Sequence, residues 1–199
     1  MELKKINQLR EKNARRLGVL PWARFAALLP ALSAETIKRI NSLEPPRKFC
    51  GRDCPENLQF VTFGTLIQLQ TTPAGTYHET ATKLVAVLFP DLPESKINRA
   101  PARDVLGVVS MIAREMKRIG ALFDTLNEEP SQDEQRAGVG SLKFGAFGIA
   151  DYYAQRMNIT DHETAYNTPW ARIFKCLSMD KARGDYEKRL RTILQNKTQ

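Results

Sequence analysis

The feature that most constrains the fold is a run of apolar residues between Pro101 and Asn127 that recur every three or four positions. The positions are Val105, Val108, Val109, Ile112, Met116, Ile119, Leu122, Phe123 and Leu126. Residues with this spacing share one face of an α-helix, and proline fits the first turn of such a helix. The run therefore predicts one long helix over 101–127 whose apolar face is buried in a core.

Helix start signals at three other places indicate the same class of fold. Each combines a serine or threonine with a glutamate three residues later, which is the spacing of a capping box. The pairs are Thr76 with Glu79, Ser131 with Glu134, and Thr160 with Glu163. We therefore predict an all-α fold, a compact multi-helix bundle in which the helix at 101–127 packs against helices near 142–157 and 161–178.

Shorter segments between these helices are predicted from their turn residues. Residues 62–70 have the apolar spacing of a short helix, and prolines mark a turn at 90–93 that leads into a loop up to residue 100. Residues 47–57 are predicted to be a loop that can close as a short hairpin with Gly51 at its tip.

The carboxy-terminal region is predicted to contain a break and a separate last helix. Pro169 should kink or divide the segment after residue 161, and Asp180 is a suitable N-cap for the final helix. We expect that helix to direct four apolar side chains inward, namely Tyr186, Leu190, Ile193 and Leu194. Its basic side chains are expected to point outward, namely Lys181, Arg183, Lys188, Arg189 and Arg191. Gly145 and Gly148 are interpreted as small residues that let another helix approach closely.

The net charge of +8 is concentrated at the two ends of the chain. Residues 1–16 carry six Lys/Arg against two acids, and residues 172–199 carry eight against three. We therefore divide the chain into a basic amino-terminal helix or arm at 1–30 and a helical domain at 31–199. Such basic ends favour polyanions or acidic protein surfaces as partners.

Several classes of protein do not fit this sequence. The amino terminus lacks an apolar segment of signal-peptide length, and the densest aliphatic run, Leu84–Phe89, is too short to span a bilayer. Three cysteines do not form the disulfide framework of a small secreted protein. We expect no membrane partner and a location in a reducing cytoplasm.

The sequence also provides no metal, cofactor or catalytic signature. Cys50 and Cys54 form one half of a zinc motif, but structural zinc needs four ligands, and the other candidates stand alone. These candidates are His78, His162 and Cys176. Because no nucleophile–base pair is recognisable either, we expect a protein that is not an enzyme and that binds no metal or cofactor.

The carboxy-terminal half resembles structural-module proteins of tailed bacteriophages, and most nearly tail assembly chaperones. The resembling segments are Phe144–Gly148, Asp151–Met157, Thr160–Glu163, Pro169–Arg172, Met179–Asp180 and Tyr186–Leu190. The resemblance implies a helical phage morphogenesis protein without catalysis, acting in the host cytoplasm or carried in the virion. It also implies a phage structural protein of the tape-measure or tail-tube type as partner, kept from premature aggregation.

Partner binding requires apolar and aromatic anchors, and cations steer an acidic partner. The residues that we assign to this role are Phe144, Phe147, Tyr152, Tyr153, Trp170, Phe174, Arg189 and Arg191. For each aromatic residue the alternative is a place in the core. A second copy of the chain is another partner that we consider. The alternative function is that of a nucleic-acid-binding accessory protein that uses its basic terminal helices.

Overall fold

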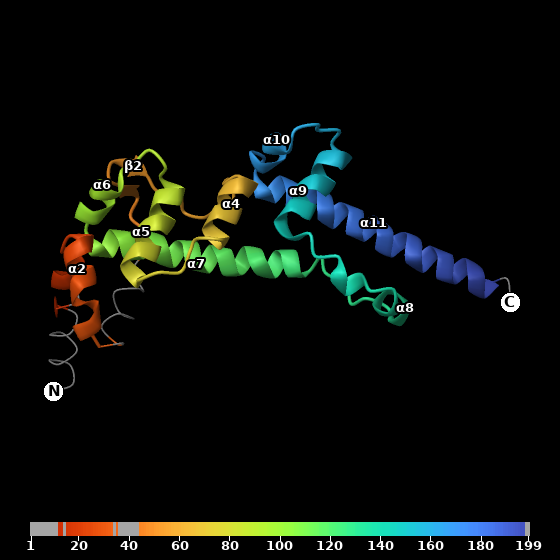
Figure 1. Cartoon of the computed structure of the whole chain (residues 1–199), viewed down its shortest axis with the longest axis horizontal. Coiled ribbons are helices and arrows are strands. Elements are labelled where there is room, and N and C mark those ends of the chain that lie inside the picture. Colours follow the sequence, from red (N-terminus) through yellow and green to blue (C-terminus); the bar gives the residue numbers. More distant parts are fainter. Residues whose placement is uncertain (1–11, 14, 34, 36–43, 198–199) are drawn as a thin grey trace. The chain divides into compact units, whose positions relative to one another are not determined.

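The computed structural model of the chain describes residues 12–13, 15–33, 35 and 44–197. Over these residues the fold is all-α, as predicted, with one two-stranded sheet (Figure 1). Most of the basic helix expected near the amino terminus lies outside the described residues. None of the described helices is long and apolar enough to cross a membrane.

The described chain divides into two compact units. Unit 1 comprises the residues up to Leu58 together with Gln68–Lys117, and unit 2 comprises Gln59–Ile67 together with the residues from Arg118 onward. The division at residue 30 between an arm and a helical domain stays a prediction.

The long helix predicted from the apolar spacing is confirmed as α7, which spans Ala102–Asp124. Its first part, through Lys117, belongs to unit 1, and its last turns belong to unit 2. The buried apolar side chains of α7 are Ala102, Val105, Leu106, Val108, Met111, Ile112 and Ile119. Val105, Val108, Ile112 and Ile119 are three, four and seven positions apart, so they lie on one face of the helix in the core. Ala102, Leu106 and Met111 widen that buried face.

The other helices of unit 1 are α2 (Trp22–Leu28), η1 (Leu29–Ala31), α5 (Tyr77–Leu88) and α6 (Glu94–Arg99). Helix α5 begins with the predicted capping box, in which the hydroxyl of Thr76 accepts from the Glu79 amide. The prediction of a loop up to residue 100 is wrong, because residues Glu94–Arg99 form α6. Pro93 provides the N-cap position of α6, and Glu94 lies in its first turn, where a carboxylate is favourable.

The predicted hairpin is present and consists of β1 (Lys48–Phe49) and β2 (Arg52–Asp53). The two turn residues, Cys50 and Gly51, both have positive φ angles, of 48° and 85°. Positive φ at both central positions defines the tight turn that suits an antiparallel pair, and glycine adopts it at no steric cost.

In each unit, one isolated β-bridge that contains a proline joins the starts of two helices. In unit 1, Pro21 pairs with Pro101, and the Trp22 amide donates to the Ala100 carbonyl at 2.8 Å. In unit 2, Thr62 pairs with Pro169, and the Phe63 amide donates to the Thr168 carbonyl at 2.8 Å. Each bridge satisfies backbone groups that a helix start would otherwise leave unpaired.

Unit 2 contains the beginning of α4 (Phe63–Gln70), the end of α7, and the helices after it. These are α8 (Gln132–Arg136), η2 (Val139–Ser141), α9 (Gly145–Arg156), α10 (His162–Tyr166) and α11 (Trp170–Lys197). The short helix predicted over 62–70 and the capping box of Ser131 with Glu134 are both confirmed. Helix α9 packs against α10 and α11.

Three details of this region differ from the sequence prediction. The division at Pro169 is confirmed, but no separate last helix begins at Asp180, because α11 continues from Trp170 to Lys197. Neither proline nor a capping hydrogen bond interrupts the chain there, so one helix forms.

The prediction of a third capping box, formed by Thr160 and Glu163, is also wrong. Asp161 is the N-cap residue of α10, and its Oδ1 accepts from the Glu163 amide at 3.0 Å. Aspartate is as good an N-cap as threonine, and it shortens the helix by one residue.

The two glycines of α9 do not let another helix approach. Gly145 has a φ angle of 55°, with open space where a Cβ would lie, so it serves the turn into the helix. A Cβ on Gly148 would meet the Cβ of Phe144 at 2.6 Å, which is a contact within the same segment.

Candidate protein-binding surface

The part of α11 from Met179 onward presents an exposed apolar face. Its members are Met179, Tyr186, Leu190, Ile193 and Leu194, which we call the α11 face. Between 39% and 57% of each residue's surface is exposed to solvent. Tyr186, Leu190, Ile193 and Leu194 were predicted to point inward, and this prediction is wrong. The spacing identifies an apolar face correctly, but within the described chain no element covers it.

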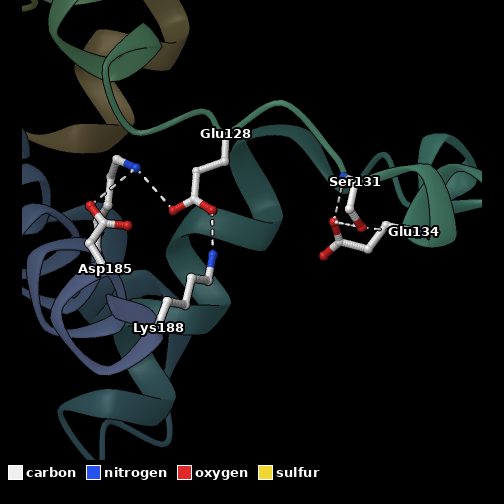
Figure 2. A network of polar contacts seen from close by, with 6 residues as sticks. Glu128, Ser131, Glu134, Asp185 and Lys188 are labelled. Carbon is white, nitrogen blue, oxygen red and sulfur yellow. Dashed lines mark hydrogen bonds and ion pairs between the residues drawn. The ribbon is translucent and has the colours of Figure 1, made fainter. Parts of the chain in front are cut away.

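Helix α11 is held by ion pairs on another of its faces (Figure 2). Glu128, in the segment between α7 and α8, accepts from Lys181 Nζ at 3.0 Å and from Lys188 Nζ at 2.5 Å. Lys181 also pairs with Asp185 at 3.6 Å. The two lysines hold the pKa of Glu128 down at about 2, through their hydrogen bonds first and their charges second.

The segment that carries Glu128 leads directly into the capped start of α8. Figure 2 shows Ser131 and Glu134 next to it, and the Ser131 amide donates to Glu134 Oε2 at 2.7 Å. This hydrogen bond is also the main cause that lowers the pKa of Glu134. Glu128 is therefore presented to α11 from a short segment whose end is a closed capping box.

The anchored face and the exposed face lie on opposite sides of α11. Lys181 and Lys188 are seven residues apart, as are Tyr186 and Ile193, so each pair lies along one line of the helix. At about 100° per residue, Lys188 is about 160° around the helix from Tyr186 and Ile193 is only about 20° from it. The contacts that hold α11 in unit 2 therefore leave the apolar face directed away from them.

A second set of polar contacts joins α9 to the middle of α11. Arg156 Nε lies 2.6 Å from Asp180 Oδ2, and the hydroxyl of Tyr152 donates to the same oxygen at 3.2 Å. Partial burial, followed by the charge of Asp180, raises the pKa of Tyr152. Asp180 was predicted to cap a helix, and it instead connects two helices.

A groove of about 570 Å³ lies beside these contacts in unit 2. Apolar side chains form much of its lining, and charged ones border it. The lining residues are Phe123, Asp124, Leu126, Asn127, Ile149, Tyr152, Leu177, Asp180 and Lys181. The groove thus combines apolar side chains with the polar groups that hold α9 and α11 together.

The aromatic residues that we predicted as partner anchors fall into two groups. Phe144, Phe147 and Tyr152 are exposed at the surface of unit 2. The ring of Phe147 stacks on His162 at 5.1 Å between centroids, and His162 Nε2 lies 2.9 Å from Asp151 Oδ1. The stacking on His162 orients the exposed ring of Phe147 without covering it.

Tyr153 and Trp170 instead lie in the core, with exposed fractions of 1% and 3%. Trp170 packs against the rings of Phe123 and Phe174, at centroid distances of 6.1 and 6.3 Å. Arg118 lies 5.9 Å above the indole. The side chains of Tyr153 and Trp170 are therefore not available as surface anchors. Phe174 is half-buried in the aromatic cluster around Trp170.

The two predicted steering cations, Arg189 and Arg191, are exposed on α11. Arg191 donates from Nε to the Glu187 carbonyl at 3.4 Å, within its own helix. None of the five members of the α11 face was predicted as a binding residue. Apolar spacing could have found them, but spacing is the same for a face that meets the core and a face that meets a partner.

The described residues contain no group of three or more His, Cys, Asp or Glu side chains arranged to hold a metal ion. Burial raises the pKa of Cys54 to about 11 and also raises that of Cys50. A raised pKa leaves less of each thiol in the reactive thiolate form at neutral pH. His78, another candidate ligand, stacks on Trp22 at 5.6 Å and hydrogen-bonds Asn98.

Comparison of the chain with protein-family models, with curated proteins and with solved structures found no match. Function is therefore inferred from the chemistry of the surface of unit 2.

Proposed function

We propose that this protein acts without catalysis, by binding another protein through unit 2. The observation that carries the proposal is the α11 face, a row of apolar side chains on a helix anchored by its opposite side. An exposed apolar row of this kind is costly in water unless a partner covers it. A helix that is fixed before binding also loses less conformational entropy when the partner arrives.

The class of partner follows from the resemblance of the carboxy-terminal half to tail assembly chaperones. We propose that the chain is a phage morphogenesis protein of that kind, working in the host cytoplasm. Its partner would be a tape-measure or tail-tube type protein, which exposes apolar surface before it assembles. Covering that surface with the α11 face delays aggregation, because aggregation uses the same exposed apolar groups.

The alternative function, nucleic-acid binding, is favoured by one observation. Residues 181–197 carry six Lys/Arg against two acids, so the exposed end of α11 is strongly basic. A phosphate-binding surface gains affinity from such charge and loses it steeply with added salt. It gains nothing from large aliphatic side chains between the cations, which is why protein binding is the better account of this helix.

Co-expression tests the proposal. The chain is expressed together with the tape-measure or tail-tube protein of the same phage genome, and the soluble fraction of that protein is measured with and without the chain. We expect the tail protein to become more soluble and to co-elute with the chain in size-exclusion chromatography.

Two results would contradict the proposal. One is that both tail proteins behave the same with and without the chain. The other is that the purified chain binds duplex or single-stranded DNA with a steep salt dependence and no tail protein at all. The second result would establish the nucleic-acid function in its place.

A further inference from the structure

We propose that the α11 face binds an acidic amphipathic helix of another protein. This inference deepens the proposed function and rests on it, since it assumes that α11 is a protein-binding element. It adds the chemistry of the partner segment, namely an apolar row flanked by carboxylates.

The dimensions of the α11 face fit a helix. The rise from Met179 to Leu194 is about 22 Å, at 1.5 Å per residue. Its members follow a spacing of seven, four, three and one residues, so they form a narrow row of about four turns. A partner helix that places its own apolar residues three and four apart would cover such a row along its length.

The charges beside the row select the sign of the partner. Arg183 and Arg189 lie three residues before and three residues after Tyr186, about 60° to either side of it. Arg189 lies beyond one edge of the row, and Arg183 lies in line with Leu190 and Leu194, about two to three turns before them. In the described structure neither arginine takes part in an ion pair. Lys181 and Lys188, by contrast, are already paired with Glu128 on the other side of the helix. Carboxylates along both edges of a bound helix would meet the two arginines.

The same charges disfavour the other occupants within reach. A second copy of α11 would bring eight Lys/Arg and three acids against an identical set, so like charges would face each other. The chain's own first sixteen residues are also basic, with six Lys/Arg against two acids. Nucleic acid would match the charge, but it would leave the apolar row in contact with sugar and phosphate rather than with another apolar surface.

The experiment uses the full chain and three probes. The first is a designed amphipathic peptide helix with leucines on one face and glutamates along both edges of that face. The second has the same leucines with lysines at the edges, and the third is a short DNA in single-stranded and duplex form. All are labelled, and binding is followed by fluorescence anisotropy at physiological salt.

We expect the acidic peptide to bind at least about tenfold more tightly than the lysine peptide. Replacing both Tyr186 and Ile193 by serine should weaken its binding about tenfold or more, because central apolar anchors dominate such interfaces. The matched control is Phe60→Ser with Leu142→Ser, which removes two exposed apolar residues elsewhere on unit 2 and should leave binding unchanged.

A second variant tests the charge selection independently of the apolar row. Changing both Arg183 and Arg189 to glutamate should reverse the preference between the two peptides. The control changes two exposed arginines of unit 1, Arg24 and Arg47, to glutamate, which alters the net charge by the same amount. Thermal melting followed by circular dichroism verifies that each variant is folded.

Several results would overturn the inference. These are equal affinity for both peptides, binding of DNA alone, self-association in sedimentation that is lost on replacing Tyr186 and Ile193, or an unchanged peptide affinity in that variant. If a tail protein still binds the variant, the inference fails while the proposed function survives. If the wild-type chain binds no tail protein, the proposed function fails by itself.

Discussion

Replacing Trp170 by alanine separates a core role from a surface role at a position where the sequence allows both. The indole is only 3% exposed and contacts Phe123 and Phe174, with Arg118 above the ring. Removing a buried tryptophan side chain costs about 3–5 kcal/mol of stability, including the cavity that it leaves. We expect a loss in this range. Tyr186→Ala is the matched control, because Tyr186 is exposed and its loss should change stability by no more than about 0.5 kcal/mol.

The assay is urea unfolding followed by far-ultraviolet circular dichroism, with the free energy extrapolated to water. The chain has two tryptophans, so in the Trp170→Ala variant the fluorescence of Trp22 reports on unit 1 alone. A loss below about 1 kcal/mol, or one equal to that of Tyr186→Ala, would refute the placement of Trp170 in the core.

Three further predictions concern other parts of the molecule. Thr82→Val should cost about 1–3 kcal/mol in urea unfolding, because Trp22 Nε1, which donates to the Thr82 hydroxyl at 2.9 Å, is left unpaired while buried. The stabilising contribution of Glu128 should be fully present above its ordinary pKa of 4.5 and disappear as the pH falls to about 2, so Glu128→Gln should show a weaker pH dependence of unfolding over that window. Native mass spectrometry of protein purified without chelator should show no zinc, and a stoichiometric ion lost on mutating Cys50 or Cys54 would contradict this.

Much of the fold follows from local rules that one sequence makes visible. The apolar spacing of α7 is long enough to define a single helix with a buried face, and the hydroxyl–glutamate pairs at Thr76 and Ser131 begin helices where expected. The capping error at Thr160 has a local cause, because Asp161 competes with it for the same role and either residue can accept from the following amides.

The candidate surface could be predicted only in part, because it depends on what α11 meets in three dimensions. The spacing of Tyr186, Leu190 and Ile193 identifies an apolar face but does not say whether another element covers it. Which face of α11 is exposed depends on Glu128, more than fifty residues earlier in the chain. Glu128 pairs with Lys181 and Lys188 and so anchors the opposite face of the helix. Tyr153 and Trp170 were predicted as surface anchors but are buried, because aromatic residues suit both a core and an interface.

The central claim is that the α11 face contacts the partner protein, and site-specific photo-crosslinking tests it most directly. A photoreactive phenylalanine derivative is placed at Ile193 in one variant and at Gln195 in another, so that the two probes lie on opposite sides of the same helical turn. In a complex with the proposed tail-protein partner, we expect a crosslink from position 193 and little from position 195. A crosslink from 195 but not 193, or from neither in a complex that forms normally, would contradict the account.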